Sequence, residues 1–108
     1  MTVTTLGRVN VATPGTPVAL STDPTQRVAR IFAQVVPGLT GKGYLGKSNM
    51  IRATLVGVMR ILWPNSGGGF SENFMVESAD GTDALNLSEY FVDMDVAGEG
   101  LLVSYWTE

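Results

Sequence analysis

The final part of the chain shows the clearest alternation of apolar and polar positions. The apolar positions are Tyr90, Val92, Met94 and Val96, and the positions between them are Phe91, Asp93 and Asp95. A period of two residues over this length predicts a β-strand with one buried face. Gly98-Glu99-Gly100 tolerates a turn, and the β-rich run 101–106 follows it. We therefore predict a β-hairpin that joins 87–96 to 101–106.

Shorter segments upstream have the same character. In residues 27–36, one face carries Ala29, Ile31, Ala33 and Val35, and the other carries Val28, Arg30, Phe32 and Gln34. Pro37-Gly38 ends this strand. Other expected strands are 3–12, 16–20, 43–46 and 70–77. Residues 51–62 also fit a helical stripe, but their β-branched side chains and Gly57 favour a strand over 56–62.

Turn-forming residues separate these segments. The expected turns and loops are 13–15, 21–24, 47–49, 64–69 and 79–83, and a tight helical turn is expected at 85–88. About eight short strands at regular spacing predict an all-β fold, a single-domain antiparallel β-sandwich of jelly-roll type, with a barrel as the alternative. A chain of 108 residues suits one domain over 1–108. Residues 1–6 could form an extended N-terminal arm in place of a strand.

The composition lacks two residue types that enzymes commonly use in catalysis. The chain has no Cys and no His, so it lacks thiolate metal ligands and the commonest general base at neutral pH. Its charged fraction is only 16%, which leaves an unusually neutral surface. We therefore expect a protein that is not an enzyme, with no cofactor and no small-molecule substrate.

The two signs of charge are segregated along the chain. All seven basic residues lie in the first sixty positions, and nine of the ten acidic residues lie from Glu72 onward. If strands of the two halves interleave, the surface is mixed, and this is the account we favour. The alternative is a basic face and an acidic face that promote ordered association. With a net charge of −3 and few arginines, the chain is not expected to bind nucleic acid.

Two motifs suggest phosphate binding or metal binding, but neither has the surrounding residues that such binding requires. Gly41–Ser48 matches G-x-x-x-x-G-K-[ST], which cradles phosphate only between a buried strand and a helix. Bulky Tyr44 and Leu45 lie inside it, so nucleotide binding is the least favoured alternative. The pairs Asp80/Asp83 and Asp93/Asp95 offer too few oxygens for calcium. We expect Asp93 and Asp95 to face solvent on one side of a strand, with no metal bound.

Nothing in the sequence indicates a membrane segment. The N-terminus lacks a basic region followed by an apolar one, and Gly57 and Arg60 interrupt the longest apolar run. We expect a soluble protein that is made in a cytoplasm.

Several phrases resemble a known class of virion proteins. They are Asn10–Leu20, the strand 27–34, Pro37–Gly46, Leu87–Tyr90 and Asp93–Gly100. Together they resemble the cement, or head-decoration, proteins that tailed bacteriophages encode near the major capsid gene. Residues 48–61 depart from the resemblance, because they are longer and more apolar than expected.

The resemblance implies a structural role. Such a protein would be made in the cytoplasm of the bacterial host and would bind the outside of the phage capsid. There it would clamp neighbouring subunits of the major capsid protein, as a homo-oligomer, either dimer or trimer. The expected interface residues are Met1, Thr2, Val3, Thr4, Thr5, Leu6, Trp63 and Phe70. The alternative is a virion fibre or spike head that binds the host surface.

Overall fold

The computed structural model describes residues 2–36, 39–64 and 72–108. Its strands are β1 (Thr2–Asn10), β2 (Val18–Ala19), β3 (Arg27–Val28), β4 (Arg30–Val35), β5 (Gly43–Ile51), β6 (Val56–Leu62), β7 (Asn73–Glu77), β8 (Leu85–Asn86), β9 (Tyr90–Met94) and β10 (Gly100–Thr107). One 3-10 turn, η1 (Leu87–Glu89), precedes β9. The described residues contain no α-helix.

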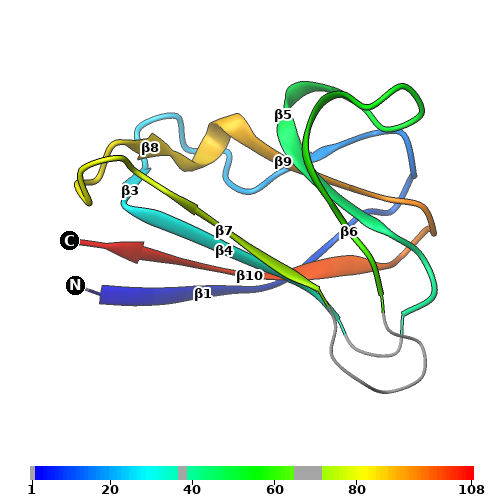
Figure 1. Cartoon of the computed structure of the whole chain (residues 1–108), viewed down its shortest axis with the longest axis horizontal. Coiled ribbons are helices and arrows are strands. Elements are labelled where there is room, and N and C mark those ends of the chain that lie inside the picture. The colour runs from blue at the N-terminus through cyan, green and yellow to red at the C-terminus, as the bar shows by residue number, and fades with distance from the viewer. Residues whose placement is uncertain (1, 37–38, 65–71) are drawn as a thin grey trace.

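The strands pair as one long hairpin that has been rolled up. From the outside inward, β1 pairs with β10, β2 with β9, β3 with β8, β4 with β7 and β5 with β6, always antiparallel. Rolling adds the pairs β10·β4 and β9·β5. The result is two four-stranded sheets, sheet A of order β1-β10-β4-β7 and sheet B of order β2-β9-β5-β6, with β3 and β8 as a separate two-stranded sheet (Figure 1). The predicted antiparallel β-sandwich is confirmed, and its nested pairing is that of a jelly roll.

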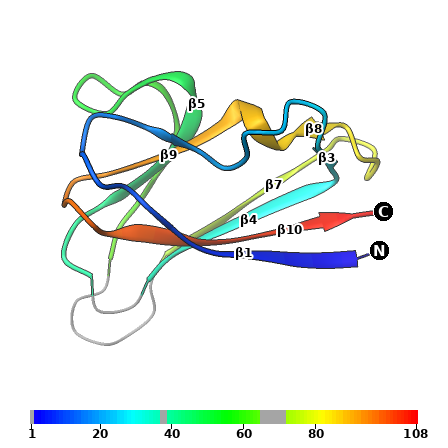
Figure 2. The same ribbon diagram turned by 180° about the vertical axis from the view of Figure 1, so that it is seen from behind.

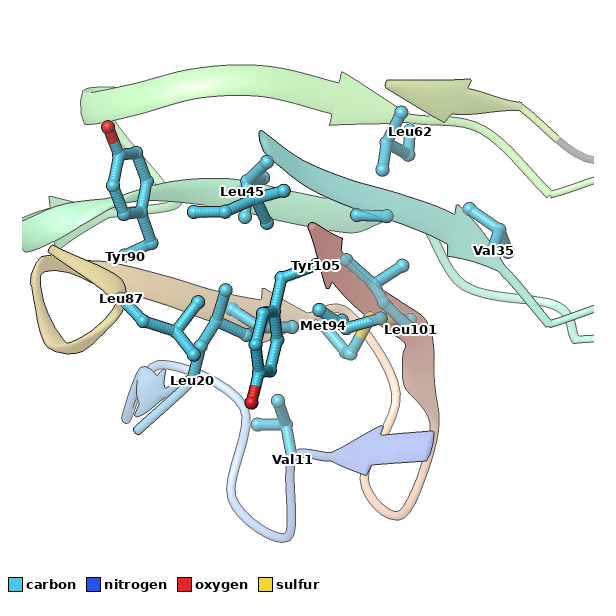
Figure 3. Packing of buried hydrophobic residues seen from close by; sticks show 14 of the residues in the cluster. Val11, Leu20, Val35, Leu45, Leu62, Leu87, Tyr90, Met94, Leu101 and Tyr105 are labelled. Atoms are coloured by element: carbon cyan, nitrogen blue, oxygen red, sulfur yellow. The ribbon is translucent and has the colours of Figure 1, made fainter. Parts of the chain in front are cut away.

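The core lies between the two sheets (Figure 3). In β4, Ile31, Ala33 and Val35 are fully buried, whereas the residues between them are partly exposed. Sheet B contributes Leu45 and Val92, both fully buried, to the same cluster. Each such side chain contributes roughly 1.5–3 kcal/mol when it is removed from water. Burial of alternate residues therefore fixes the register of both sheets.

The predicted C-terminal hairpin is wrong. The strands β9 and β10 do not pair; β9 belongs to sheet B and β10 to sheet A. Residues 95–99 carry the chain from one sheet to the other, where Val11 N–H donates to the Glu99 carbonyl at 2.9 Å. Both strands have an apolar face, and Val92 and Leu101 are both buried, one in each sheet. The two strands therefore cover the same core from opposite sides.

Smaller boundaries also differ from the prediction. The strand at 56–62 is confirmed, but the loop expected at 47–49 is part of β5, which runs on to Ile51. A bend at Ala29 separates β3 from β4 and turns Val28 inward, so Val28 is buried. The turn at 79–83 is confirmed. The helical turn expected at 85–88 is present as η1, but it begins at Leu87, because residues 85–86 form β8.

Residues 2–6, for which an extended arm was the alternative to a strand, belong to β1. From Thr2 onward the chain pairs with β10, beginning with Thr2 opposite Thr107. The two ends of the chain therefore lie side by side at one end of the molecule (Figure 2). Because β1 has a partner on one side only, it forms an edge of sheet A.

We predict that Leu45→Ala lowers the free energy of unfolding by about 2–5 kcal/mol, because it leaves a cavity in the centre of the core. Urea denaturation measures the loss. The matched control is Leu102→Ala, which removes a leucine that is exposed on the outer face of β10. The control should cost less than about 1 kcal/mol. Equal losses for the two variants would contradict the assigned core.

Candidate functional site: an apolar hairpin tip and its ionic brace

The turn between β5 and β6 presents apolar side chains to solvent. Ile51, Leu55 and Val56 are 52%, 50% and 49% exposed, and Ile51 and Val56 are cross-strand partners. Met59, further along β6, is also exposed. We call these four residues the apolar tip. Figure 1 shows that the turn projects beyond the strands around it.

The backbone of the tip is strained. Leu55 has a φ of 64°, and it is the one non-glycine residue with positive φ in the described ranges. A residue with a Cβ pays about 1–2 kcal/mol in this conformation, and glycine or asparagine would fit it better. A bulky, half-exposed leucine therefore stands where folding alone would favour another residue. Strain of this kind is often found where a side chain serves binding.

A cluster of charged residues, which we call the ionic brace, ties the turn between β5 and β6 to the strands beside it. Arg52, the first residue of the turn, donates from Nη1 to Asp95 Oδ1 at 2.9 Å. Its Nε lies 3.7 Å from Asp93 Oδ2 and has no hydrogen-bond partner. Asp95 also accepts a hydrogen bond from the Tyr44 hydroxyl at 2.9 Å and lies 3.9 Å from Lys42 Nζ. The tip is thereby tied to the end of β9 and to β5.

Asp93 is fully buried, which corrects the prediction that it faces solvent. Its carboxylate accepts from Gly15 N–H at 3.1 and 3.2 Å and from Met94 N–H at 2.8 Å. The loop that precedes β2 lies against the outer side of β9 and covers this position. Alternation along β9 correctly separated Asp93 from the core-facing residues. It could not reveal that a loop distant in sequence would bury the other side.

Tyr44, a member of this cluster, has a raised pKa. Burial raises the pKa of its hydroxyl above the usual value for tyrosine, and the hydrogen bond to the Asp95 carboxylate raises it further. Tyr44 therefore stabilises the fold fully below the pKa of tyrosine in the unfolded chain. This contribution is lost as the pH rises through the higher pKa of the folded protein.

Basic residues of the first half of the chain lie beside acidic residues of the second half, as expected if strands of the two halves interleave. In the described part of the chain, every salt bridge joins a base of the first half to an acid of the second half. The pairs are Arg30–Glu77, Lys42–Asp95, Lys47–Glu89, Arg52–Asp93 and Arg52–Asp95. Nested pairing explains this, because it places early strands beside late ones.

The predicted interface residues are exposed but do not form one surface. Thr2, Val3, Thr4, Thr5 and Leu6 are exposed along β1 in sheet A. Trp63 is 55% exposed, follows β6 of sheet B, and has Lys42 Nζ 4.6 Å from its ring centroid. Met1 and Phe70 lie outside the described residues. The apolar tip was not predicted as an interface. Its signal was present in the apolar run 51–59, where the sequence departs from the resemblance.

The phosphate-loop match has a different explanation. Residues 43–51 form β5, so the residues directly after Ser48 continue a strand and do not begin a helix. Gly46 is required because a Cβ there would lie 2.3 Å from the Gly57 carbonyl of the neighbouring strand. The glycine therefore permits close strand packing, and the strand-loop-helix geometry of a phosphate cradle is not formed.

The rest of the described chain offers no second candidate site of these kinds. Within 2–36, 39–64 and 72–108, no three acidic residues gather closely enough to hold a metal ion. The charges of Asp93 and Asp95 are already balanced by Arg52 and Lys42. In the same ranges, no helix has the length and apolar character needed to cross a membrane. Comparison with protein-family models, curated proteins and solved structures finds no match to this chain.

We predict that Asp93→Asn lowers the free energy of unfolding by about 2–3 kcal/mol, because Arg52 loses its buried counter-charge and Gly15 N–H faces an amide. Thermal denaturation at neutral pH measures the loss. The control is Asp80→Asn, at an exposed turn where the carboxylate accepts hydrogen bonds only from Thr82. A wild-type melting temperature for Asp93→Asn would contradict the brace.

We also predict that Tyr44 ionises at a higher pH than the free amino acid. Ultraviolet titration of the wild type minus that of Tyr44→Phe isolates its transition. Asp95→Asn should move this transition to lower pH, because it removes the carboxylate that favours the neutral hydroxyl. An unchanged transition in Asp95→Asn would show that burial alone sets the shift.

Proposed function

We propose that this protein is a non-enzymatic virion protein that binds the outside of a phage capsid and stabilises contacts between subunits of the major capsid protein. The observation that carries the proposal is the apolar tip, which is strained at Leu55 and braced by Arg52. A surface of this kind suits packing against another protein. It has no catalytic group within it.

The fold is consistent with this role. Jelly rolls recur among viral capsid domains, although they also occur in lectins and other proteins, so the fold supports the proposal by analogy only. The sequence phrases that resemble cement proteins point the same way.

The energetics favour a repeated contact. The tip side chains are already about half buried, so complete burial of each would contribute about 1 kcal/mol. One tip therefore gives a weak contact. A capsid repeats the same site many times, and a cement protein that holds more than one site gains affinity from this repetition. In this proposal the tip enters an apolar depression between neighbouring capsid subunits.

We predict that Leu55→Gly weakens binding to the capsid about fivefold for each tip, which corresponds to about 1 kcal/mol, while it preserves or slightly raises stability. Glycine accepts the left-handed backbone and relieves the strain, but it removes an apolar side chain of the tip. Co-sedimentation with capsids of the phage that encodes the chain measures binding. The melting temperature of the variant measures stability.

The matched control is Val96→Ala, which trims an exposed apolar residue away from the tip. It should bind as the wild type does, and the bound wild type should raise the temperature at which the capsids rupture. Failure of the wild type to bind capsids would overturn the proposal. Binding to host cells or glycans in place of capsids would favour the fibre or spike alternative.

A further inference from the structure

The edges of the two sheets differ in how they are protected. An unpaired strand edge attracts other strands, and proteins usually shorten it, charge it or cover it. On sheet B, β2 is only two residues long and follows Pro17. The strands β6 and β7 adjoin at their ends, where Trp63 N–H donates to Glu72 Oε1 at 2.7 Å. Among the edges of the two four-stranded sheets, β2 is therefore blunted by its length, and β6 and β7 each carry a charged residue, Arg60 and Glu77.

The remaining edge, β1, is protected over only half of its length. A bulge interrupts its pairing between Thr5 and Gly7, and Arg8 follows the bulge. Before it, the segment Thr2–Leu6 contains no proline and no charge. All five of these residues are exposed. Threonine and valine, which dominate the segment, are strong strand formers.

We infer that Thr2–Leu6 pairs with the same segment of a second copy, antiparallel and across a two-fold axis. Such pairing makes sheet A of both copies continuous and satisfies the free backbone groups of both edges. The occupant is a second copy because the edge is uncharged and therefore complements itself. Each copy carries a net charge of −3, and this edge is a place where two copies meet without opposing like charges.

If the two segments pair so that Thr4 lies on the two-fold axis, the side chains that lie opposite one another are compatible. It places Val3 opposite Thr5 of the partner subunit on the outer face, and Thr4 opposite Thr4 of the partner subunit at the axis. Val3 is 54% exposed in the single chain and is the cross-strand partner of Trp106 on that face. In the dimer, the partner strand covers Val3 from the side of β1 that has no neighbouring strand in the single chain. Pairs of β-branched residues are favourable across strands.

The dimer and the capsid contact use different parts of the molecule. The apolar tip belongs to sheet B, whereas β1 is an edge of sheet A. The inference therefore stands whether or not a capsid is the partner. If both hold, a dimer presents two tips and gains avidity.

The test is analytical ultracentrifugation. The wild type, Thr4→Lys and Thr4→Glu are each measured alone, and the two variants are also measured together in an equimolar mixture. The wild type should be a dimer. Each variant alone should dissociate at least about tenfold more readily, because two like charges meet at the axis. The mixture should recover the dimer through opposite charges. Circular dichroism confirms that each variant is folded.

Two further measurements separate this edge from others. Amide hydrogen exchange over Thr2–Leu6 should slow as protein concentration rises, whereas exchange over β7, an edge of the same sheet, should not change. Leu55→Lys, in the tip, should leave the dimer intact. A monomeric wild type at millimolar concentration overturns the inference. So does an oligomer, dimer or trimer, that Thr4→Lys does not weaken, or a mixture that stays monomeric.

Discussion

The buried carboxylate of Asp93 joins strand β9 to the loop before β2 and to the turn after β5. Both the shape of the protein and its candidate site depend on these contacts. Asp93 lies on β9, receives backbone hydrogen bonds from Gly15 and Met94, and lies beside Arg52. A buried carboxylate is costly unless charge and hydrogen bonds compensate it. The loop before β2 and the turn after β5 supply that compensation. The same contacts that make burial of the charge tolerable hold the tip in place.

This arrangement gives the molecule two kinds of exposed surface. The apolar tip is a protrusion of side chains, whereas the N-terminal half of β1 offers backbone groups. The first suits a partner with a matching depression, and the second suits another strand. Neither surface is strongly charged, since the bases of early strands are paired with the acids of late ones. Association at both surfaces would therefore depend weakly on salt.

Nested pairing explains why a sequence with segregated charges gives a mixed surface. The first strand lies beside the last, and the innermost pair, β5 and β6, forms the closed end of the rolled hairpin. Most contacts thus join residues far apart in sequence. Folds of this kind form slowly, because long loops must close before distant strands can stabilise one another. An exposed edge such as Thr2–Leu6 is then a risk unless it has a partner.

The sequence by itself determined most of the strands and the fold class. Period-two alternation marked β4 and β9, and Pro-Gly turns limited strand length, because these signals act over a few neighbouring residues. It also contained the apolar run of the tip, although its role was not predicted. Tertiary structure decided which strands became neighbours. It separated β9 from β10, paired 2–6 with β10, and buried Asp93 under a loop some eighty residues earlier in the chain. These outcomes depend on how two apolar faces enclose one core, and that choice is made between distant segments.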